Sequence, residues 1–94
     1  MLEDYVVIDL EMTGLNAKTD AILEVGAVRV RDGRQTETYG AILKCGRELS
    51  ERVVELTGIT PEMAADGREP EEVMQEFFTF LGDDVLVGQN VIFD

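Results

Sequence analysis

The stretch that decides the fold is residues 5–15, which read Tyr5-Val6-Val7-Ile8-Asp9-Leu10-Glu11-Met12-Thr13-Gly14-Leu15. Its apolar opening predicts a strand buried within a sheet. Side chains two residues apart in a strand point to the same side, so Asp9 and Glu11 should converge just before a glycine turn. Carboxylates held this close repel, and each makes the other harder to ionise. A divalent cation relieves the conflict, and oxygen ligands of this kind suit Mg²⁺ or Mn²⁺.

A solvated strand edge is the alternative interpretation of Asp9 and Glu11, because such triplets are common in acidic proteins. Two observations favour the metal-binding interpretation. The residues before Asp9 indicate a buried strand, so this side chain should not be freely solvated. A second carboxylate motif also stands at the other end of the chain.

The second motif covers residues 88–94, Gly-Gln-Asn-Val-Ile-Phe-Asp, and follows the apolar run 85–87, which also looks like a buried strand. Asn90 is a good helix N-cap, and Asp94 lies one helical turn later. If the two apolar strands are parallel neighbours, Asp94 comes beside Asp9 and Glu11 at the edge where open α/β sheets place their sites. An ordinary helix start with an exposed Asp94 is the alternative.

Length and composition limit the classes of protein and of catalytic site that the chain can form. The chain has 94 residues, enough for one small domain, and no segment that could cross a membrane or act as a secretory signal. The single cysteine, Cys45, cannot form an internal disulfide, which fits a cytoplasmic protein. Because the chain contains no histidine, it excludes His-based zinc sites and Ser-His or Cys-His catalytic pairs within itself.

The net charge of −12 is unevenly distributed. Residues 1–45 carry five basic and eight acidic side chains, whereas residues 46–94 carry three basic and twelve acidic ones. This balance argues against a nonspecific phosphate-binding surface, which needs Lys and Arg. An acidic protein can still handle nucleic acid if bound metals reverse the local field.

Periodicity and turn signals predict the remaining elements. Asp32-Gly33 is a strong two-residue hairpin turn, and Ser50, Thr60-Pro61 and Pro70 are helix starts. In the last helix, Val73, Phe77 and Leu81 share one stripe and Met74 and Phe78 the adjacent one, which is the pattern of a core-facing helix. The expected strands cover 5–11, 22–31, 36–44 and 85–87, and the expected helices run from 50 to 56, from 61 to near 67 and from 70 up to 82.

This order predicts an α/β fold with a mixed sheet, in which an antiparallel three-strand meander leads through a helical crossover to a parallel fourth strand. The helix that Asn90 should open has no body within the sequence, and a sheet covered on one face would expose a large apolar patch. We therefore expect residues 1–94 to be the N-terminal portion of a single domain that is incomplete at its C-terminus.

The motifs resemble those of the DEDD superfamily of 3′-to-5′ exonucleases, the group that includes the proofreading subunit of bacterial DNA polymerase III. The D-x-E motif with its small turn is residues 9–15, the N-x-x-x-D motif is residues 90–94, and a Leu-Thr-Gly-Ile-Thr segment between them is residues 56–60. All three appear in the family's order, and the resemblance spans the whole chain. It implies a ribonuclease H-like fold.

The resemblance also implies roles for individual residues. It implies a metal-dependent 3′-to-5′ exonuclease that hydrolyses phosphodiester bonds at single-stranded 3′ ends with two Mg²⁺ or Mn²⁺ ions, with a DNA polymerase subunit as an expected partner. The implied catalytic and metal-binding carboxylates are Asp9, Glu11 and Asp94. The implied substrate contacts are Met12, Thr13, Leu15, Leu56, Ile59, Asn90 and Phe93, and a core role for Phe93 is equally open.

Two departures from the family pattern accompany the match. Gln89 stands where the family often has His, and the family's third motif, which carries the fourth carboxylate and a general base, is absent from the 94 residues. We expect the segment to be inactive alone for that reason.

An alternative from a different class is a non-catalytic acidic module that binds a basic partner such as a polymerase or helicase. The sequence leaves DNA and RNA substrates equally open.

Overall fold

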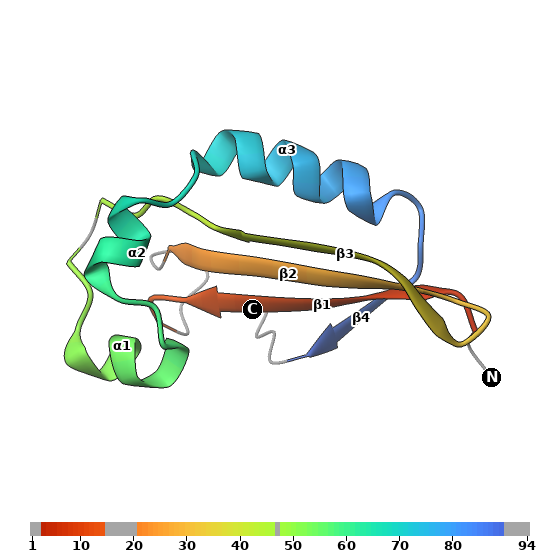
Figure 1. Ribbon diagram of the computed structural model, residues 1–94, viewed down its shortest axis with the longest axis horizontal. Coiled ribbons are helices and arrows are strands. Elements are labelled where there is room, and N and C mark those ends of the chain that lie inside the picture. The colour runs from red at the N-terminus through yellow and green to blue at the C-terminus, as the bar shows by residue number, and fades with distance from the viewer. Residues whose placement is uncertain (1–2, 15–20, 47, 90–94) are drawn as a thin grey trace.

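The computed structural model describes residues 3–14, 21–46 and 48–89 of the chain. Four strands form a single mixed sheet in the order β3-β2-β1-β4, with helices on both faces (Figure 1). The strands are β1 (Tyr5–Met12), β2 (Ile22–Arg31), β3 (Arg34–Ile42) and β4 (Leu86–Gln89), and the helices are α1 (Glu51–Thr57), α2 (Pro61–Ala65) and α3 (Pro70–Leu81).

The first three strands form the antiparallel meander that the sequence predicts. The turn between β2 and β3 consists of Asp32 and Gly33, which both have positive φ, as a tight two-residue hairpin turn requires. β3 begins two residues earlier than expected, because this short turn lets Arg34 pair directly with Arg31. The two-residue loop therefore sets the register of the hairpin.

The helices begin at the residues that the sequence indicates, but α1 ends at Thr57, one residue later than expected, and α2 ends at Ala65, before the expected end near Gly67. Ser50 and Thr60 cap α1 and α2 through side-chain oxygens that accept from the backbone N–H groups of Val53 and Met63. α3 has Pro70 in its first turn and ends at Gly82, whose backbone N–H donates to the carbonyl of Phe78. These local signals set the ends of each helix, whereas packing of apolar side chains holds the helices against the sheet.

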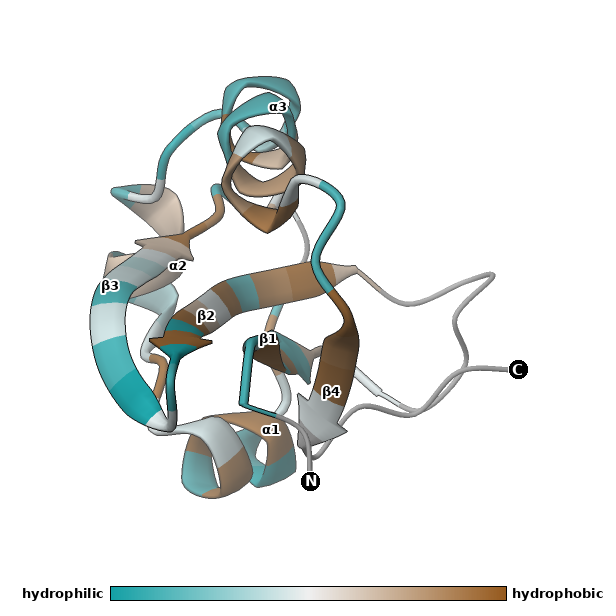
Figure 2. Ribbon diagram, turned by 90° about the vertical axis from the view of Figure 1, so that its right-hand side faces the viewer, coloured by the Kyte–Doolittle hydropathy of each residue, from teal (hydrophilic) through white to brown (hydrophobic). Residues whose placement is uncertain are grey.

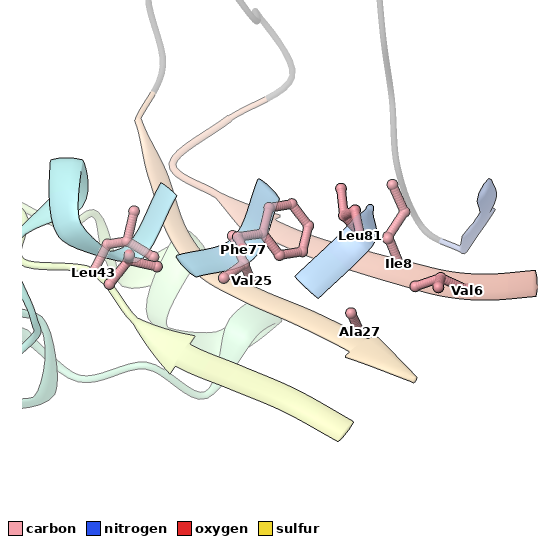
Figure 3. Close-up of a cluster of buried hydrophobic side chains, with 8 residues drawn as sticks. Val6, Ile8, Val25, Ala27, Leu43, Phe77 and Leu81 are labelled. Atoms are coloured by element: carbon pink, nitrogen blue, oxygen red, sulfur yellow. The ribbon is translucent and has the colours of Figure 1, made fainter. Parts of the chain in front are cut away.

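One face of the sheet is covered by α3 and carries the main core. Val73, Phe77 and Leu81 of α3 pack on apolar side chains from β1 and β2, as Figure 3 shows. The apolar side of α3 points at the sheet and its polar side points to solvent (Figure 2). A second, smaller cluster joins Leu23 to Ile59 and Ala64 near α2. The predicted core stripe at positions 73, 77 and 81 is thus confirmed.

Two expectations about burial are wrong. Phe78, placed on the adjacent core stripe by its spacing, is 62% exposed. Residues 85–87 were expected in a buried strand, yet all three are exposed, because β4 lies at the edge of the sheet and pairs only with β1 among the described strands. A continuous apolar run does not by itself distinguish a central strand from an apolar edge.

The predicted crossover is confirmed. β4 runs parallel to β1, with Val6 beside Leu86 and Asp9 beside Gln89, and α3 lies along the connection (Figure 1). The mixed α/β sheet therefore has the predicted topology. Within the residues that the structure describes, no helix is long and apolar enough to cross a membrane. Leu15, Asn90, Phe93 and Asp94 lie outside the described residues.

Candidate functional site

The carboxylates of β1 lie on the face of the sheet opposite α3. Val6 and Ile8 are buried in the core beneath α3, so the alternation of side chains puts Asp9 and Glu11 on the other face. α1 lies on that second face, near the end of β1 (Figures 1 and 2). The strand period thus separates the core side chains from the acidic ones, as the sequence predicts.

Asp9 is partly buried, and its environment is unusual. Among the described residues, its buried Oδ1 atom has no hydrogen-bond partner. The residue opposite it on β2 is Gly26, which has no side chain to cover this position, and the next residue in the same row is Gly40 on β3. A buried carboxylate oxygen without a donor is costly, so this atom is well suited to a ligand that brings positive charge or a proton.

Glu11 feels the same crowding. Burial raises the pKa of the Glu11 carboxyl above its ordinary value, and the negative charges of Asp9 and Glu24 raise it further. Glu24 is the cross-strand partner of Glu11 on β2. The negative charge of Asp9 thus disfavours ionisation of Glu11, as expected, and Glu24 adds to this effect. Sequence reasoning missed Glu24, although an acid between Leu23 and Val25 in an apolar strand was a visible signal.

A β-bulge marks the end of this strand. The register between β1 and β2 shifts between Glu11 and Met12, so that Met12 pairs with Ile22. Thr13 then fixes the chain: its backbone N–H donates to the Ala21 carbonyl, and its hydroxyl oxygen accepts from the Ala21 N–H, both at 2.9 Å. Bulges beside active sites redirect side chains. Here the bulge allows consecutive residues to turn toward one cavity.

That cavity has a volume of about 500 Å³ and lies between the end of β1 and α1. Its wall on the strand side comes from residues 10–14, which include the predicted site residues Glu11, Met12 and Thr13. Its wall on the helix side includes Leu56, also predicted, which is 72% exposed and open to a ligand. The volume falls within the range of small-ligand pockets.

The helix side also supplies residues that the sequence did not single out. Ser50, Arg52, Val53 and Thr57 line the cavity alongside Leu56. An i, i+3, i+4 pattern on α1 places them on one helix face, but a seven-residue helix gives too short a pattern to identify that face from sequence. The wall is mainly apolar, with hydroxyl groups and one guanidinium.

The remaining predicted site residues are placed differently. Ile59 is only 2% exposed and packs with Leu23 and Ala64, so its position is that of a core residue and not of a base contact. Leu15, Asn90, Phe93 and Asp94 are not among the described residues, so their predicted roles stay predictions. Gln89 pairs with Asp9 on the neighbouring parallel strand, which brings the start of the second motif to the first.

The donors present fit a hard divalent cation in part. Asp9 offers an unpartnered buried oxygen, and Glu11 lies in the same strand end with an ionisation that its neighbours disfavour. Both are ligands of the kind that Mg²⁺ and Mn²⁺ prefer. Among residues 3–14, 21–46 and 48–89, however, no three carboxylate, cysteine or histidine side chains come together as a metal-binding group. A further ligand would have to come from elsewhere.

The sequence profile of the RNase T family, described as Exonuclease, matches residues 6–94. The chain belongs to this exonuclease family. It is 44% identical, over 90 residues and 96% of its length, to a protein of Thermotoga petrophila named DNA polymerase III PolC-type. It spans only 7% of the length of that relative.

Solved structures carry the same fold. The chain aligns with Exonuclease X in complex with 5′ overhanging duplex DNA at a TM-score of 0.75 and 27% identity, covering 92% of this chain and 48% of that one. It also aligns with the product-bound structure of exonuclease I at a TM-score of 0.81 and 18% identity, covering 96% of this chain and 22% of that one. The predicted ribonuclease H-like sheet is therefore confirmed.

Proposed function

We propose that the chain is part of a metal-dependent exonuclease that removes nucleotides from single-stranded 3′ ends of DNA, in a protein that also contains a polymerase. Membership of the exonuclease family supports the reaction class. The relative named DNA polymerase III PolC-type supports the association with a polymerase. The domain would continue beyond this segment, with the fourth carboxylate and the general base of the family supplied from outside it.

One observation carries the proposal: the D-x-E carboxylates and the cavity meet at the same end of β1. Glu11 lines the cavity, and Asp9 holds an unpartnered oxygen two residues before it on the same face. A nucleotide in the cavity would therefore lie beside the carboxylates. Such proximity of substrate and catalytic groups is the first requirement of an effective site.

The position of each residue indicates the role that it would have. Asp9 and Glu11, together with Asp94 from the second motif, would hold Mg²⁺ or Mn²⁺. Divalent ions bound there would activate a water molecule and stabilise the leaving oxygen of the phosphodiester. Met12 and Leu56 would contact the terminal base or sugar through apolar surface, because both line the cavity. The paired N–H and hydroxyl of Thr13 would keep this wall in place.

The test uses the full-length protein and single-stranded oligonucleotides with a label at either end. With a 5′ label, removal from the 3′ end gives a ladder of shortened products, whereas 5′-to-3′ removal releases the label at once. We expect the ladder with Mg²⁺ or Mn²⁺ and no reaction in excess chelator. Matched DNA and RNA strands compare the two substrates, and equal or faster degradation of RNA would contradict the DNA assignment.

Asp9→Asn is the matched variant, since it keeps the shape of the side chain and removes its charge. We expect activity to fall by at least about 100-fold with folding retained, because loss of a ligand should cost no less than loss of one of its outer-shell partners. The control is Asp32→Asn, which changes an exposed acid in the β2–β3 turn. If Asp9→Asn keeps full activity, catalysis would lie outside this segment, which would overturn the proposal and favour a non-catalytic acidic module.

A further inference from the structure

Among the described residues that line the cavity, Arg52 has the one basic side chain. It projects from α1, is exposed, and faces the strand end that carries Glu11. The chain around it has a net charge of −12, and Arg52 is one of only three basic residues in its second half. Its guanidinium is therefore the described group of this cavity that could bind an anionic ligand.

The ion pairs of the described residues leave Arg52 out. Arg29, Arg31, Lys44 and Arg68 each pair with at least one carboxylate of β3, of α3 or of the residues just before and after α3. Their positions are explained by stabilisation of the fold. Arg52 lacks such a partner in the described structure, and its guanidinium offers five N–H donors to a ligand that enters the cavity.

We infer that Arg52 contacts a backbone phosphate near the 3′ end of the bound strand and so positions the substrate for hydrolysis. This inference rests on the proposed function. A nucleotide brings an apolar base, polar sugar oxygens and an anionic phosphate, and the cavity presents the complementary groups. Val53 and Leu56 form the apolar wall, Ser50 and Thr57 add hydroxyls, and Arg52 supplies the fork of donors that suits a phosphate.

Charge balance gives the contact its importance. An acidic chain repels the phosphates of an approaching strand, and cations bound by Asp9 and Glu11 would offset this repulsion only at the reacting bond. Arg52 extends the favourable field from the strand end to the helix side of the same cavity. Phosphate contacts of this kind fix the register of the strand and carry no base specificity. Arg52 is accordingly a positioning residue.

The experiment compares Arg52→Gln and Arg52→Lys in the full-length protein, using single-stranded DNA at several salt concentrations. For Arg52→Gln we expect KM to rise about 3- to 10-fold while kcat stays nearly constant, as loss of one charged hydrogen bond to substrate predicts. The dependence of log(kcat/KM) on log salt should become shallower by about 0.7, the slope for one phosphate on a single strand. Arg52→Lys should keep the wild-type salt slope.

Arg34→Gln is the matched control, because Arg34 is also exposed, takes no part in the described ion pairs, and lies in the hairpin at the opposite end of the sheet from α1 (Figure 1). It should change neither KM nor the salt slope. A second arm uses oligonucleotides with one neutral methylphosphonate linkage at each of the last few positions. At the contacted linkage, wild type and Arg52→Gln should have the same KM.

The outcomes separate the two proposals. If the wild-type protein does not shorten the strand from its 3′ end, the proposed function fails. If the wild type is active and Arg52→Gln keeps its salt slope, or loses affinity equally with every methylphosphonate strand, the phosphate contact is wrong. An equal effect in Arg34→Gln would also overturn it, since it would show a response to overall charge.

Discussion

The two faces of the sheet differ in how their side chains are satisfied. The face under α3 is covered by apolar side chains, with Val6, Val25, Val73 and Phe77 in one buried cluster. The opposite face carries Asp9 with an unpartnered oxygen, Glu11 with a raised pKa, and a cavity. The same β1 strand contributes to both. One face lowers the free energy of the fold, and the other keeps unfavourable groups in place.

The two faces of β1 therefore have different roles: one contributes to stability and the other carries the groups of the candidate site. Crowded carboxylates destabilise the free protein, and they persist only where surrounding structure holds them. The core under α3 supplies that rigidity, because β1 cannot shift without moving buried side chains. We therefore expect substitutions on the two faces to have opposite signatures in stability and catalysis.

The largest effect on stability should come from Phe77→Ala. Phe77 is buried and packs between α3 and the sheet, so truncation leaves a cavity and should lower the free energy of unfolding by about 3–5 kcal/mol. The neighbouring Phe78→Ala is the control: with 62% of its surface exposed, it should cost less than about 1 kcal/mol. Denaturant unfolding measures both. Similar losses for the two variants would remove the distinction between the packed face and solvent.

On the face opposite α3, binding of a divalent cation should stabilise the fold. Mg²⁺ or Mn²⁺ at about ten times its dissociation constant should raise the free energy of unfolding by about 1–2 kcal/mol, as mass action allows. Asp9→Asn should abolish most of this gain, and should itself stabilise the metal-free protein because it deletes one of the repelling charges. Calorimetry with and without Mg²⁺ checks both statements. A midpoint that moves equally in wild type and Asp9→Asn would show that these carboxylates do not bind the ion.

The fold was predictable where local chemistry decides it. The Asp32-Gly33 turn, the Ser50 cap and the Pro70 start act within a few residues, and each element is found where these signals place it. The exposure of Phe78 and of residues 85–87 could not be obtained the same way. Periodicity gives the side of an element, whereas burial depends on which neighbours cover that side.

The site was predictable as a motif and less so as a cavity. Asp9 and Glu11 share a face because the strand period is two, which any reader of the sequence can deduce. The bulge between Glu11 and Met12 has no local signal, and it is what brings consecutive residues to the cavity. Glu24 is brought to the site by the register of β2 with β1, and Arg52 by the placement of α1. Both are tertiary effects. Ile59 belongs to the motif but lies in the core.

A smaller effect should follow removal of a helix cap beside the cavity. Ser50→Ala deletes the oxygen that accepts from the Val53 N–H and should cost about 1 kcal/mol of stability. Because α1 forms one wall of the cavity, KM should rise as well. Thr60→Ala removes the corresponding cap of α2 and should cost a similar amount with KM unchanged, since Thr60 does not line the cavity. Equal KM values in the two variants would show that α1 takes no part in substrate binding.

The smallest effect should be a pH-dependent one on the α3 side. Arg68 donates to both oxygens of Glu76 and Tyr39 donates to one, and these bonds lower the pKa of Glu76 to about 2. A depressed carboxyl pKa stabilises the fold above the unfolded value of about 4.3 and loses that contribution as pH falls toward the folded value. Glu76→Gln should therefore lower the thermal midpoint at pH 7, and the gap from wild type should close between about pH 4.3 and 2.

Glu71→Gln, which removes an exposed acid of the same helix outside these ion pairs, should show no such convergence. A gap that stays constant with pH would mean that Glu76 acts through packing, and that the charges around α3 add nothing to the stability of the covered face.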